Sequence, residues 1–205
     1  MATYAGDVRD ADALAQAAAD FSGRHGVPDV VIGNAGISRG ALTDKAADLP
    51  VFRAVLETNV LGLVHTFHPF LAPMRERGRG TLVGIASVAG FRGLPGSGAY
   101  SGSKAAAIAY LESLRVEEAG SGIAVVTICP GYIATPMTAK NPYAMPFLMQ
   151  PDAAAEKMIA AIEARRRFCV VPWQMALIGR ALTLMPRSLY DAAFARAPRK
   201  PRLPE

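Results

Sequence analysis

The sequence contains few cysteines and few histidines, which narrows the chemistry that it can support. Only 2 cysteines and 3 histidines occur in 205 residues. Cys129 and Cys169 each lie in an apolar, strand-like run, where a free thiol behaves as a small buried hydrophobic group, so we expect no disulfide. His65 and His68 lie close in sequence, but no Cys, Asp or Glu at ligand spacing completes a set, so we expect no metal.

The sequence also lacks a long apolar run. A membrane-spanning helix needs about 18 or more consecutive apolar residues, and no such run occurs. The closest segment, Trp173 to Met185, is interrupted by Arg180 and flanked by prolines. It either lies on a membrane surface or, as we favour, packs over a substrate pocket or a subunit interface. Because the amino terminus has no charged segment followed by an apolar one, we expect a reducing cytoplasm as the location.

Acidic residues are outnumbered by basic ones, since 17 Asp and Glu stand against 22 Lys and Arg, for a formal net charge of +5. The basic residues gather toward the carboxyl end, at Arg165, Arg166, Arg167, Arg196, Arg199, Lys200 and Arg202. No aromatic residues are interleaved with them, so the charge indicates a solvated helix end and, over residues 190–205, a partly disordered basic tail. We therefore expect no nucleic acid partner.

The apolar residues predict a single α/β domain over residues 1–205. Hydrophobic residues make up 51% of the chain, which is enough for a sizeable core. Short apolar runs alternate with helical patterns, as in a parallel sheet whose two faces are covered by helices. The predicted strands are 29–33, 81–87, 123–129 and 168–171. The predicted helices are 10–25, 49–77 with a bend or break near Pro69 and Pro73, 99–119 and 152–167, and a proline-rich loop covers 136–151.

Three polar residues near the second predicted strand have a spacing that favours proton transfer. On a helix over 99–119, Tyr100 and Lys104 are four residues apart and project from the same face. The pKa of tyrosine is normally about 10, and an ammonium group within roughly 4 to 6 Å lowers it. We therefore expect Lys104 to lower the pKa of Tyr100. Ser87 ends strand 81–87, at the carboxyl edge where open α/β sheets place ligand groups.

These residues resemble the active site of the short-chain dehydrogenase/reductase family, a serine followed about a dozen residues later by Tyr-x-x-x-Lys. Here Ser87 and Tyr100 are 13 positions apart. Further matches in the family's order are Asn34-Ala35-Gly36, Asn59 and Pro130-Gly131-Tyr132-Ile133-Ala134-Thr135. The resemblance spans about residues 3–172 and implies a doubly wound parallel-sheet Rossmann fold.

The resemblance implies a role for each matching residue. Tyr100 would be the general acid/base while hydride moves between a nicotinamide and a carbonyl or secondary alcohol substrate. Lys104 would tune Tyr100 and bind the nicotinamide ribose. Ser87 would hydrogen-bond the substrate oxygen, and Asn59 would anchor a water that connects Lys104 to solvent. The cofactor, NAD or NADP, would also contact Asp7, Asn34, Ala35, Gly36, Pro130, Gly131, Ile133 and Thr135.

The family pattern implies further features of the surroundings. Asp7 has an alternative role as a cap or first-turn acid of helix 10–25. Helices 49–77 and 99–119 would form the interface of a homodimer or homotetramer. The substrate pocket would be bordered by Phe91, Arg92, Leu94, Met137 and the loop 141–149.

One family motif does not occur in this sequence. Family members begin with a strand and a turn of the form TGxxxGxG, whose backbone N–H groups hold the cofactor pyrophosphate. Here Met1 matches the start of the family's third strand. We therefore expect an N-terminally truncated Rossmann domain without the first two strands and the first helix. Residues 3–8 would lack both neighbouring strands, and strand 29–33 would be a bare edge.

Two functions follow from this pattern. The first is an NAD(P)-dependent oxidoreductase that interconverts a carbonyl and a secondary alcohol. The second is a non-catalytic remnant or interaction module that cannot bind the dinucleotide and pairs through its exposed edge. The joint presence of Asn59, Ser87, Tyr100 and Lys104 favours the first function, because a non-catalytic remnant has no reason to keep four specific polar groups.

Overall fold

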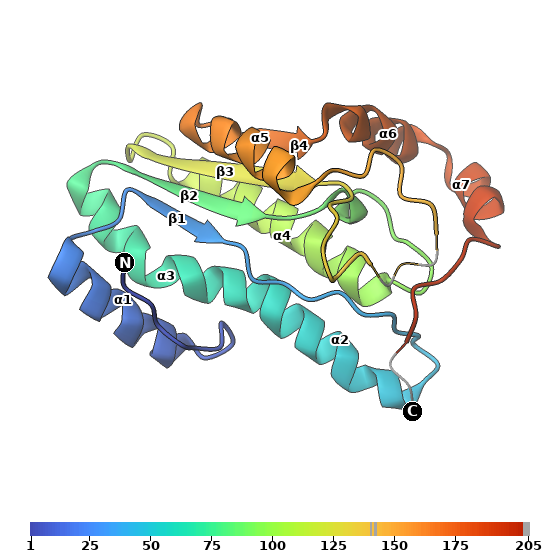
Figure 1. The fold of residues 1–205 in the computed structure, drawn as a ribbon, viewed down its shortest axis with the longest axis horizontal. Coiled ribbons are helices and arrows are strands. Elements are labelled where there is room, and N and C mark those ends of the chain that lie inside the picture. The colour runs from blue at the N-terminus through green and yellow to red at the C-terminus, as the bar shows by residue number, and fades with distance from the viewer. Residues whose placement is uncertain (140, 142, 203–205) are drawn as a thin grey trace.

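Four parallel strands lie side by side in the order in which they occur in the chain (Figure 1). The computed structural model describes residues 1–139, 141 and 143–202. The strands are β1 (Val30–Gly33), β2 (Gly80–Ile85), β3 (Ile123–Pro130) and β4 (Phe168–Val171). Each strand pairs in parallel with the next. The predicted parallel sheet of the α/β class is therefore confirmed.

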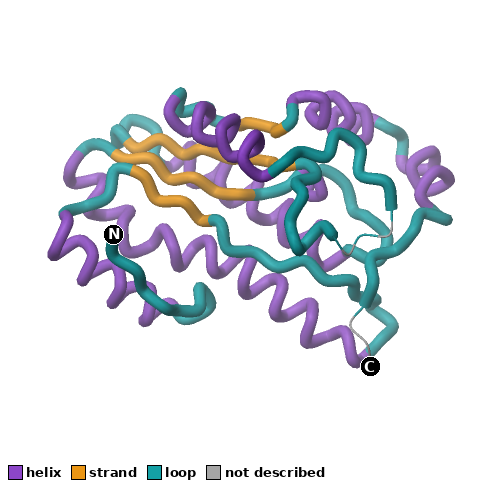
Figure 2. The backbone as a smooth tube through the Cα atoms, in the orientation of Figure 1, coloured by secondary structure: helices purple, strands orange, loops and turns teal. Residues whose placement is uncertain are grey.

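Helices connect the strands and pack on both faces of the sheet (Figure 2). Within the described residues they are α1 (Ala11–His25), α2 (Leu49–Leu56), α3 (Gly62–Arg77), α4 (Gly98–Glu117), α5 (Pro151–Glu163), α6 (Trp173–Leu184) and α7 (Arg187–Phe194). The predicted helix 152–167 ends early, at Glu163, because Arg165 has a left-handed backbone conformation with φ 47° that no helix continues through.

The predicted helix 49–77 is interrupted at a different place from the one expected. The α-helix runs through Pro69 and Pro73, so no break occurs there, and the expected bend stays a prediction. The interruption is a π-helical segment, Glu57–Leu61, between α2 and α3. A π-helical turn holds an extra residue, and such turns occur frequently at functional sites.

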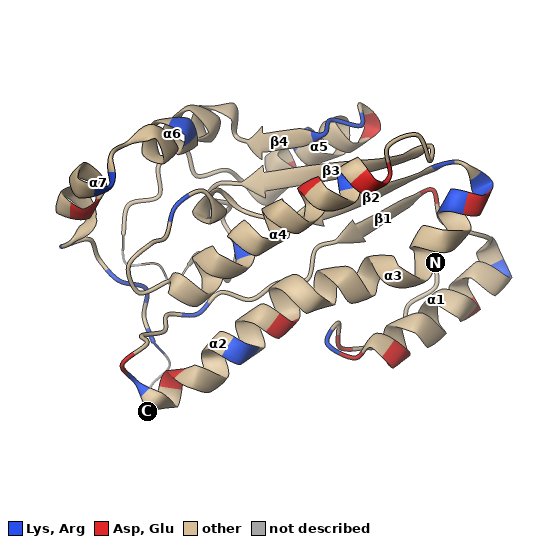
Figure 3. Cartoon of the chain, turned by 180° about the vertical axis from the view of Figure 1, so that it is seen from behind, with Lys and Arg blue, Asp and Glu red and all other residues tan. Residues whose placement is uncertain are grey.

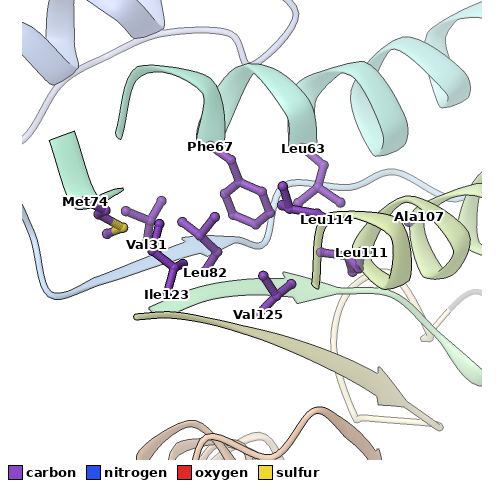
Figure 4. Packing of buried hydrophobic residues seen from close by; sticks show 10 residues of the cluster. All are labelled: Val31, Leu63, Phe67, Met74, Leu82, Ala107, Leu111, Leu114, Ile123 and Val125. Carbon is purple, nitrogen blue, oxygen red and sulfur yellow. The ribbon is translucent and has the colours of Figure 1, made fainter. Parts of the chain in front are cut away.

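Each face of the sheet carries its own part of the core. On one face, α3 and α4 pack against β1, β2 and β3, and Figure 4 shows side chains such as Phe67 and Leu111 meeting Leu82 and Val125. A side chain at Gly84 would overlap Leu111, so glycine lets α4 approach β2 closely. On the other face, α5 supplies Met158 and Ile162, which pack against Val83, Val126, Ile128 and Val171. Both helical layers hold the carboxyl ends of the strands in place.

Strand β1 forms one edge of the sheet, as expected from the family pattern. Residues 1–8 form no strand, and the chain enters directly into α1, which packs against α3 (Figure 1). On the face of β1 opposite Val31, Val30 is 42% exposed and Ile32 is 49% exposed. The expectation that both faces of this strand are covered is therefore wrong, because no described helix packs over Val30 and Ile32.

Acidic and basic residues are interspersed on the helices that Figure 3 shows. Arg53 on α2 lies between Asp48 and Glu57, which flank that helix, and at the end of α4 Arg115 pairs with Glu112 at 3.5 Å. No helix within the described residues combines the length and the apolar character that crossing a bilayer requires.

Beyond α7, the described chain continues to Arg202, and residues 203–205 of the predicted basic tail lie outside the described residues.

Self-association through β1 is a testable consequence of this edge. A bare strand edge with an exposed apolar face tends to pair with another chain. We expect Ile32→Lys to lower the fraction of oligomers in sedimentation velocity, because a charged side chain there disfavours strand pairing. Ile159→Lys on α5 is the matched control, since Ile159 is 53% exposed. Oligomers that persist in Ile32→Lys, or that disappear equally in the control, would contradict this role of the edge.

Candidate active site

The segments that follow three of the strands place site residues at one edge of the sheet. The segment 34–36 follows β1, Ser87 follows β2, and Gly131 follows β3. Because the carboxyl ends of parallel strands meet at the same edge, these residues lie close together. Two adjoining cavities open there, one of about 480 Å³ and one of about 250 Å³. Ser87, Tyr100 and Gly131 line both cavities.

Tyr100 and Lys104 lie one helical turn apart on α4. The Lys104 Nζ atom is 5.9 Å from the centre of the Tyr100 ring. It also donates a hydrogen bond of 2.8 Å to the carbonyl oxygen of Ile85, the last residue of β2. Lys104 is only 4% exposed. A buried ammonium group needs hydrogen-bond acceptors, and the end of β2 supplies one.

The hydroxyl group of Ser87 lies where β2, β3 and α4 meet. Strand β2 ends at Ile85, so Ser87 lies just beyond the strand rather than within it. Its Oγ atom accepts a hydrogen bond of 3.1 Å from the Ala89 N–H and donates one of 3.5 Å to the Pro130 carbonyl oxygen. It lines the same two cavities as the phenol of Tyr100 and lies near enough to influence its pKa.

Burial shifts the pKa values of Tyr100 and Lys104 in opposite directions. It raises the pKa of Tyr100, and the nearby hydroxyl of Ser87 lowers that pKa by a smaller amount. Burial also lowers the pKa of Lys104 to about 8. The expectation that Lys104 brings the pKa of Tyr100 below its usual value is therefore wrong in this structure. Desolvation of the phenolate outweighs the effect of Ser87, and Lys104 is not among the groups that shift this pKa.

Asn59 lies in the π-helical segment Glu57–Leu61 and is 2% exposed. Its Oδ1 atom accepts a hydrogen bond of 2.8 Å from the Ile37 N–H. Its Nδ2 atom donates to the Ile37 carbonyl oxygen at 3.0 Å and to Ser103 Oγ at 2.9 Å. The side chain thus joins the loop after β1 to α4. Ser103 is a member of this network that the motif comparison did not single out, because its partner lies 44 positions away.

Most of the residues that were predicted to contact NAD or NADP line the larger cavity. Its lining includes Asn34, Ala35, Gly36, Ser87, Tyr100, Lys104, Pro130, Gly131, Ile133 and Thr135. A Cβ atom at Gly36 would lie 3.3 Å from Asn59 Oδ1 and 3.5 Å from Lys104 Nζ. Glycine therefore keeps this wall open beside the two polar side chains.

Asp7 is not part of this cavity. It lies in a separate hollow that is also lined by Arg9, Asp10, Glu57, Leu61 and His65. Its carboxylate accepts hydrogen bonds from the Arg9 guanidinium and backbone N–H, and these bonds hold the pKa of Asp7 at about 2. Its alternative role as the helix cap is wrong, because Asp10 caps α1 by accepting a hydrogen bond of 3.0 Å from the Ala13 N–H. The cofactor contact of Asp7 stays a prediction.

Helices α6 and α7 close the smaller cavity beside Tyr100. Its apolar lining includes Leu94, Met137, Met175, Ile178, Leu182 and Phe194. Helix α6, within segment 173–185, packs over this cavity, although Trp173 and Leu177 on that helix are 66% and 57% exposed. That this helix covers a substrate pocket or a subunit interface stays a prediction. The loop 141–149 contributes Asn141, Tyr143 and Pro146, as expected, while Pro142 lies outside the described residues.

Two residues expected at the border of this cavity contribute nothing to its lining. Phe91 packs against Phe168, with 6.2 Å between the ring centres. Arg92 lies over the Tyr190 ring, with its guanidinium carbon 4.3 Å from the ring centre. Both side chains are used to hold α6 and α7 in place, so their predicted role at the border is wrong.

The carboxyl-terminal segment supplies a cavity residue that the sequence did not indicate. Lys200 lines the smaller cavity, with its Nζ atom 2.6 Å from Ser38 Oγ and 5.7 Å from the centre of the Tyr100 ring. Ser38 and Lys200 are 162 positions apart, so no local pattern relates them. No three His, Cys, Asp or Glu side chains in the described part of the chain are grouped as metal ligands would be.

Comparison with known proteins yields a consistent set of relatives. The sequence model of the short chain dehydrogenases matches residues 1–145. An uncharacterized oxidoreductase of Myxococcus xanthus (strain DK1622) is 40% identical over 190 residues, which cover 93% of this chain and 75% of that protein. The acetoacetyl-CoA reductase of Shinella zoogloeoides is 37% identical over 142 residues, which cover 69% of this chain and 58% of that protein.

A solved structure agrees with this result. The crystal structure of a short chain dehydrogenase from Burkholderia cenocepacia J2315, in complex with NADP, superimposes with a TM-score of 0.80 and 25% sequence identity. The match covers 95% of this chain and 78% of that chain.

The hydrogen bonds of Asn59 predict a loss of stability when its side chain is removed. Asn59→Ala leaves the N–H and carbonyl groups of Ile37 without their partner, and each unsatisfied buried group costs about 1–3 kcal/mol. We expect urea unfolding to show a decrease of at least that size in the free energy of unfolding. Thr58→Ala, in the same π-helical segment, is the control. Equal and small effects of the two substitutions would show that these bonds contribute little.

The buried charge of Lys104 predicts a dependence of stability on pH. Its pKa is about 8 in the folded protein and 10.5 without the protein environment. Between these values the unfolded chain binds more protons, so the free energy of unfolding rises with pH across this window. Below it, the lysine is charged in both states and the cost of burial is fully present. In chemical denaturation, the stability of the wild type relative to Lys104→Met should rise between these pH values, whereas a constant difference contradicts the burial.

Proposed function

Because the chain belongs to the short-chain dehydrogenase family, we propose that it is an NAD(P)-dependent oxidoreductase that interconverts a carbonyl and a secondary alcohol. The observation that supports this most strongly is the position of Ser87 and Tyr100 in the wall shared by two cavities. The larger cavity has Lys104 and Asn34 in its wall, whereas the smaller cavity is lined largely by apolar side chains. A cofactor on one side and a substrate on the other would both reach the same two hydroxyl groups.

The residues of the larger cavity fit the nicotinamide and ribose portion of the cofactor. Lys104 has three N–H donors and uses one on Ile85, so donors are left for the ribose hydroxyl groups. Gly36 leaves room for a ligand beside Lys104. Residues 1–205 contain no TGxxxGxG turn for the pyrophosphate. The chain therefore provides a matched site for one half of the dinucleotide, without indicating a preference for NAD or NADP.

In the proposed reaction, two hydroxyl groups have separate roles. When bound, the nicotinamide supplies or accepts the hydride. Tyr100 gives its phenolic proton to the substrate oxygen during reduction and takes it back during oxidation. Ser87 donates a hydrogen bond to the same oxygen as negative charge develops on it. Because burial raises the pKa of Tyr100, the phenol carries its proton at neutral pH, as the proton donor in carbonyl reduction must.

Asn59 is suited to the proton supply that the family resemblance implies. Its Nδ2 group uses both of its donors, while its Oδ1 atom accepts one hydrogen bond from Ile37 and has a second lone pair. That lone pair is available to anchor a water between Lys104 and solvent. Asn59 also positions α4, and Tyr100 with it, through Ser103.

The second candidate function is an interaction module without catalysis. The exposed edge formed by Val30 and Ile32 favours it, since unpaired strand edges recruit other chains. A homodimer or homotetramer is compatible with either function. It is supported by Leu56 on α2 and Val116 on α4, which are 45% and 62% exposed.

Titration with nicotinamide nucleotides separates the two functions. We propose to follow the fluorescence of NADPH, NADH and reduced nicotinamide mononucleotide as the purified protein is added. If the chain binds mainly the nicotinamide and ribose, all three should bind with similar, weak affinity. Fluorescence that does not change with any of the three would contradict the oxidoreductase and leave the interaction module.

Tyr100→Phe tests the proposed proton donor. We expect it to lower kcat for the NADPH-dependent reduction of ketones, with acetoacetyl-CoA among those assayed, by about 10²–10⁴-fold. Nucleotide binding should persist, because the ring remains in the cavity wall. Tyr110→Phe, on the same helix but packed against the core, is the matched control. Turnover that is unaffected by Tyr100→Phe would refute the role of this phenol.

A further inference from the structure

The smaller cavity contains one charged side chain among its described lining residues, and that side chain comes from the end of the chain. The lining is dominated by apolar and hydroxyl-bearing side chains, and Lys200 is the exception. Its ammonium group donates to Ser38 Oγ at 2.6 Å and lies 5.7 Å from the centre of the Tyr100 ring. No carboxylate within the described residues forms an ion pair with it. A partly buried cation with only neutral partners is ready to bind an anion.

The segment that carries Lys200 is anchored by the two residues that follow it. The Gly40 N–H donates a hydrogen bond of 3.2 Å to the Pro201 carbonyl oxygen. Arg202 forms a bidentate contact with Asp48, at 2.8 and 3.1 Å, and Asp48 is 5% exposed. This contact holds the pKa of Asp48 below its usual value. Because the backbone next to it is anchored, Lys200 belongs to the wall of the cavity.

Two glycines allow this segment to approach closely. A side chain at Gly40 would overlap the carbonyl oxygen atoms of Lys200 and Pro201. Gly96 has φ 72° and lies against Arg199, where a Cβ atom would come within 2.9 Å of the arginine Cβ. The loops after β1 and before α4 are therefore shaped to receive residues 199–202.

We propose that Lys200 binds a carboxylate group of the substrate, so that the preferred substrate is a small oxo acid with an apolar chain. This proposal rests on the proposed function, because Tyr100 defines where the carbonyl group would lie. One cation matches the single charge of a carboxylate better than the double charge of a phosphate. A volume of about 250 Å³ is below the roughly 300–1,000 Å³ of typical ligand pockets, which limits the chain length.

Burial lowers the pKa of Lys200, so an incoming carboxylate also restores a favourable environment for the charged amine. The apolar side chains of Met175, Ile178 and Leu182 would contact the carbon chain of the substrate. The carboxylate at Lys200 and the carbonyl at Tyr100 would be separated by only a few bonds, because Lys200 Nζ lies close to the Tyr100 ring.

Binding of a matched pair of probes tests this inference without turnover. The probes are 5-oxohexanoate and 5-oxohexanamide, which differ in charge but hardly in shape, and isothermal titration calorimetry measures both affinities. Hydrogen bonds to charged groups contribute about 1.5–3 kcal/mol, so we expect the acid to bind about tenfold or more tightly than the amide. Lys200→Met should remove this preference and Lys200→Arg should keep most of it. Lys157→Met, which removes an exposed lysine on α5, should have no effect.

The outcomes distinguish this inference from the proposed function. Equal affinity for acid and amide in the wild type, no binding of the acid, or an unchanged preference in Lys200→Met would overturn the role of Lys200. Acid binding that depends on Lys200, in a protein that binds no nicotinamide nucleotide, would support the anion site and refute the oxidoreductase. Circular dichroism of Lys200→Met, with a spectrum like that of the wild type, excludes unfolding as the cause of a lost preference.

Discussion

The buried ammonium group of Lys104 is the interaction on which the site depends. It is 4% exposed and donates to the carbonyl oxygen of Ile85, at the carboxyl end of β2. Together with the packing of Ala107 and Leu111, this bond holds α4 against the sheet, with Tyr100 one turn earlier on the helix. Ser87, just beyond the same strand, lines the same two cavities as the phenol. A helix and a strand end are thus joined by one charged hydrogen bond, which is stronger than a neutral one.

The structure around Lys104 compensates for the burial of its charge. Burial of a charge is unfavourable unless polar groups compensate it, and within the described residues the carbonyl oxygen of Ile85 does so in place of a carboxylate. The π-helical segment Glu57–Leu61 turns Asn59 into the interior, where it binds Ile37 and Ser103. Gly36 lies beside Asn59 and Lys104, and its missing side chain leaves Lys104 open to the larger cavity. An irregular helical turn and a glycine thus shape the same region of the site.

Much of this site could be predicted from the sequence, because its main signals are local. Apolar runs marked the four strands, and the spacing of Ser87, Tyr100 and Lys104 placed them together. Other features depend on residues distant in sequence. The raised pKa of Tyr100 arises from burial, the break at Glu57–Leu61 accompanies the contacts of Asn59, and Lys200 reaches the cavity across 162 positions. Periodicity and spacing carry no information about such contacts.

A crystal structure with reduced nicotinamide mononucleotide is the decisive measurement for the two cavities. This compound carries the nicotinamide and ribose without the adenosine half, so its binding does not require a pyrophosphate turn. We expect its ribose to lie against Lys104 and its ring beside Ser87 and Tyr100, in the larger cavity. Density for the nucleotide in the apolar cavity near Lys200, or in the hollow beside Asp7, would contradict the assignment of the two cavities.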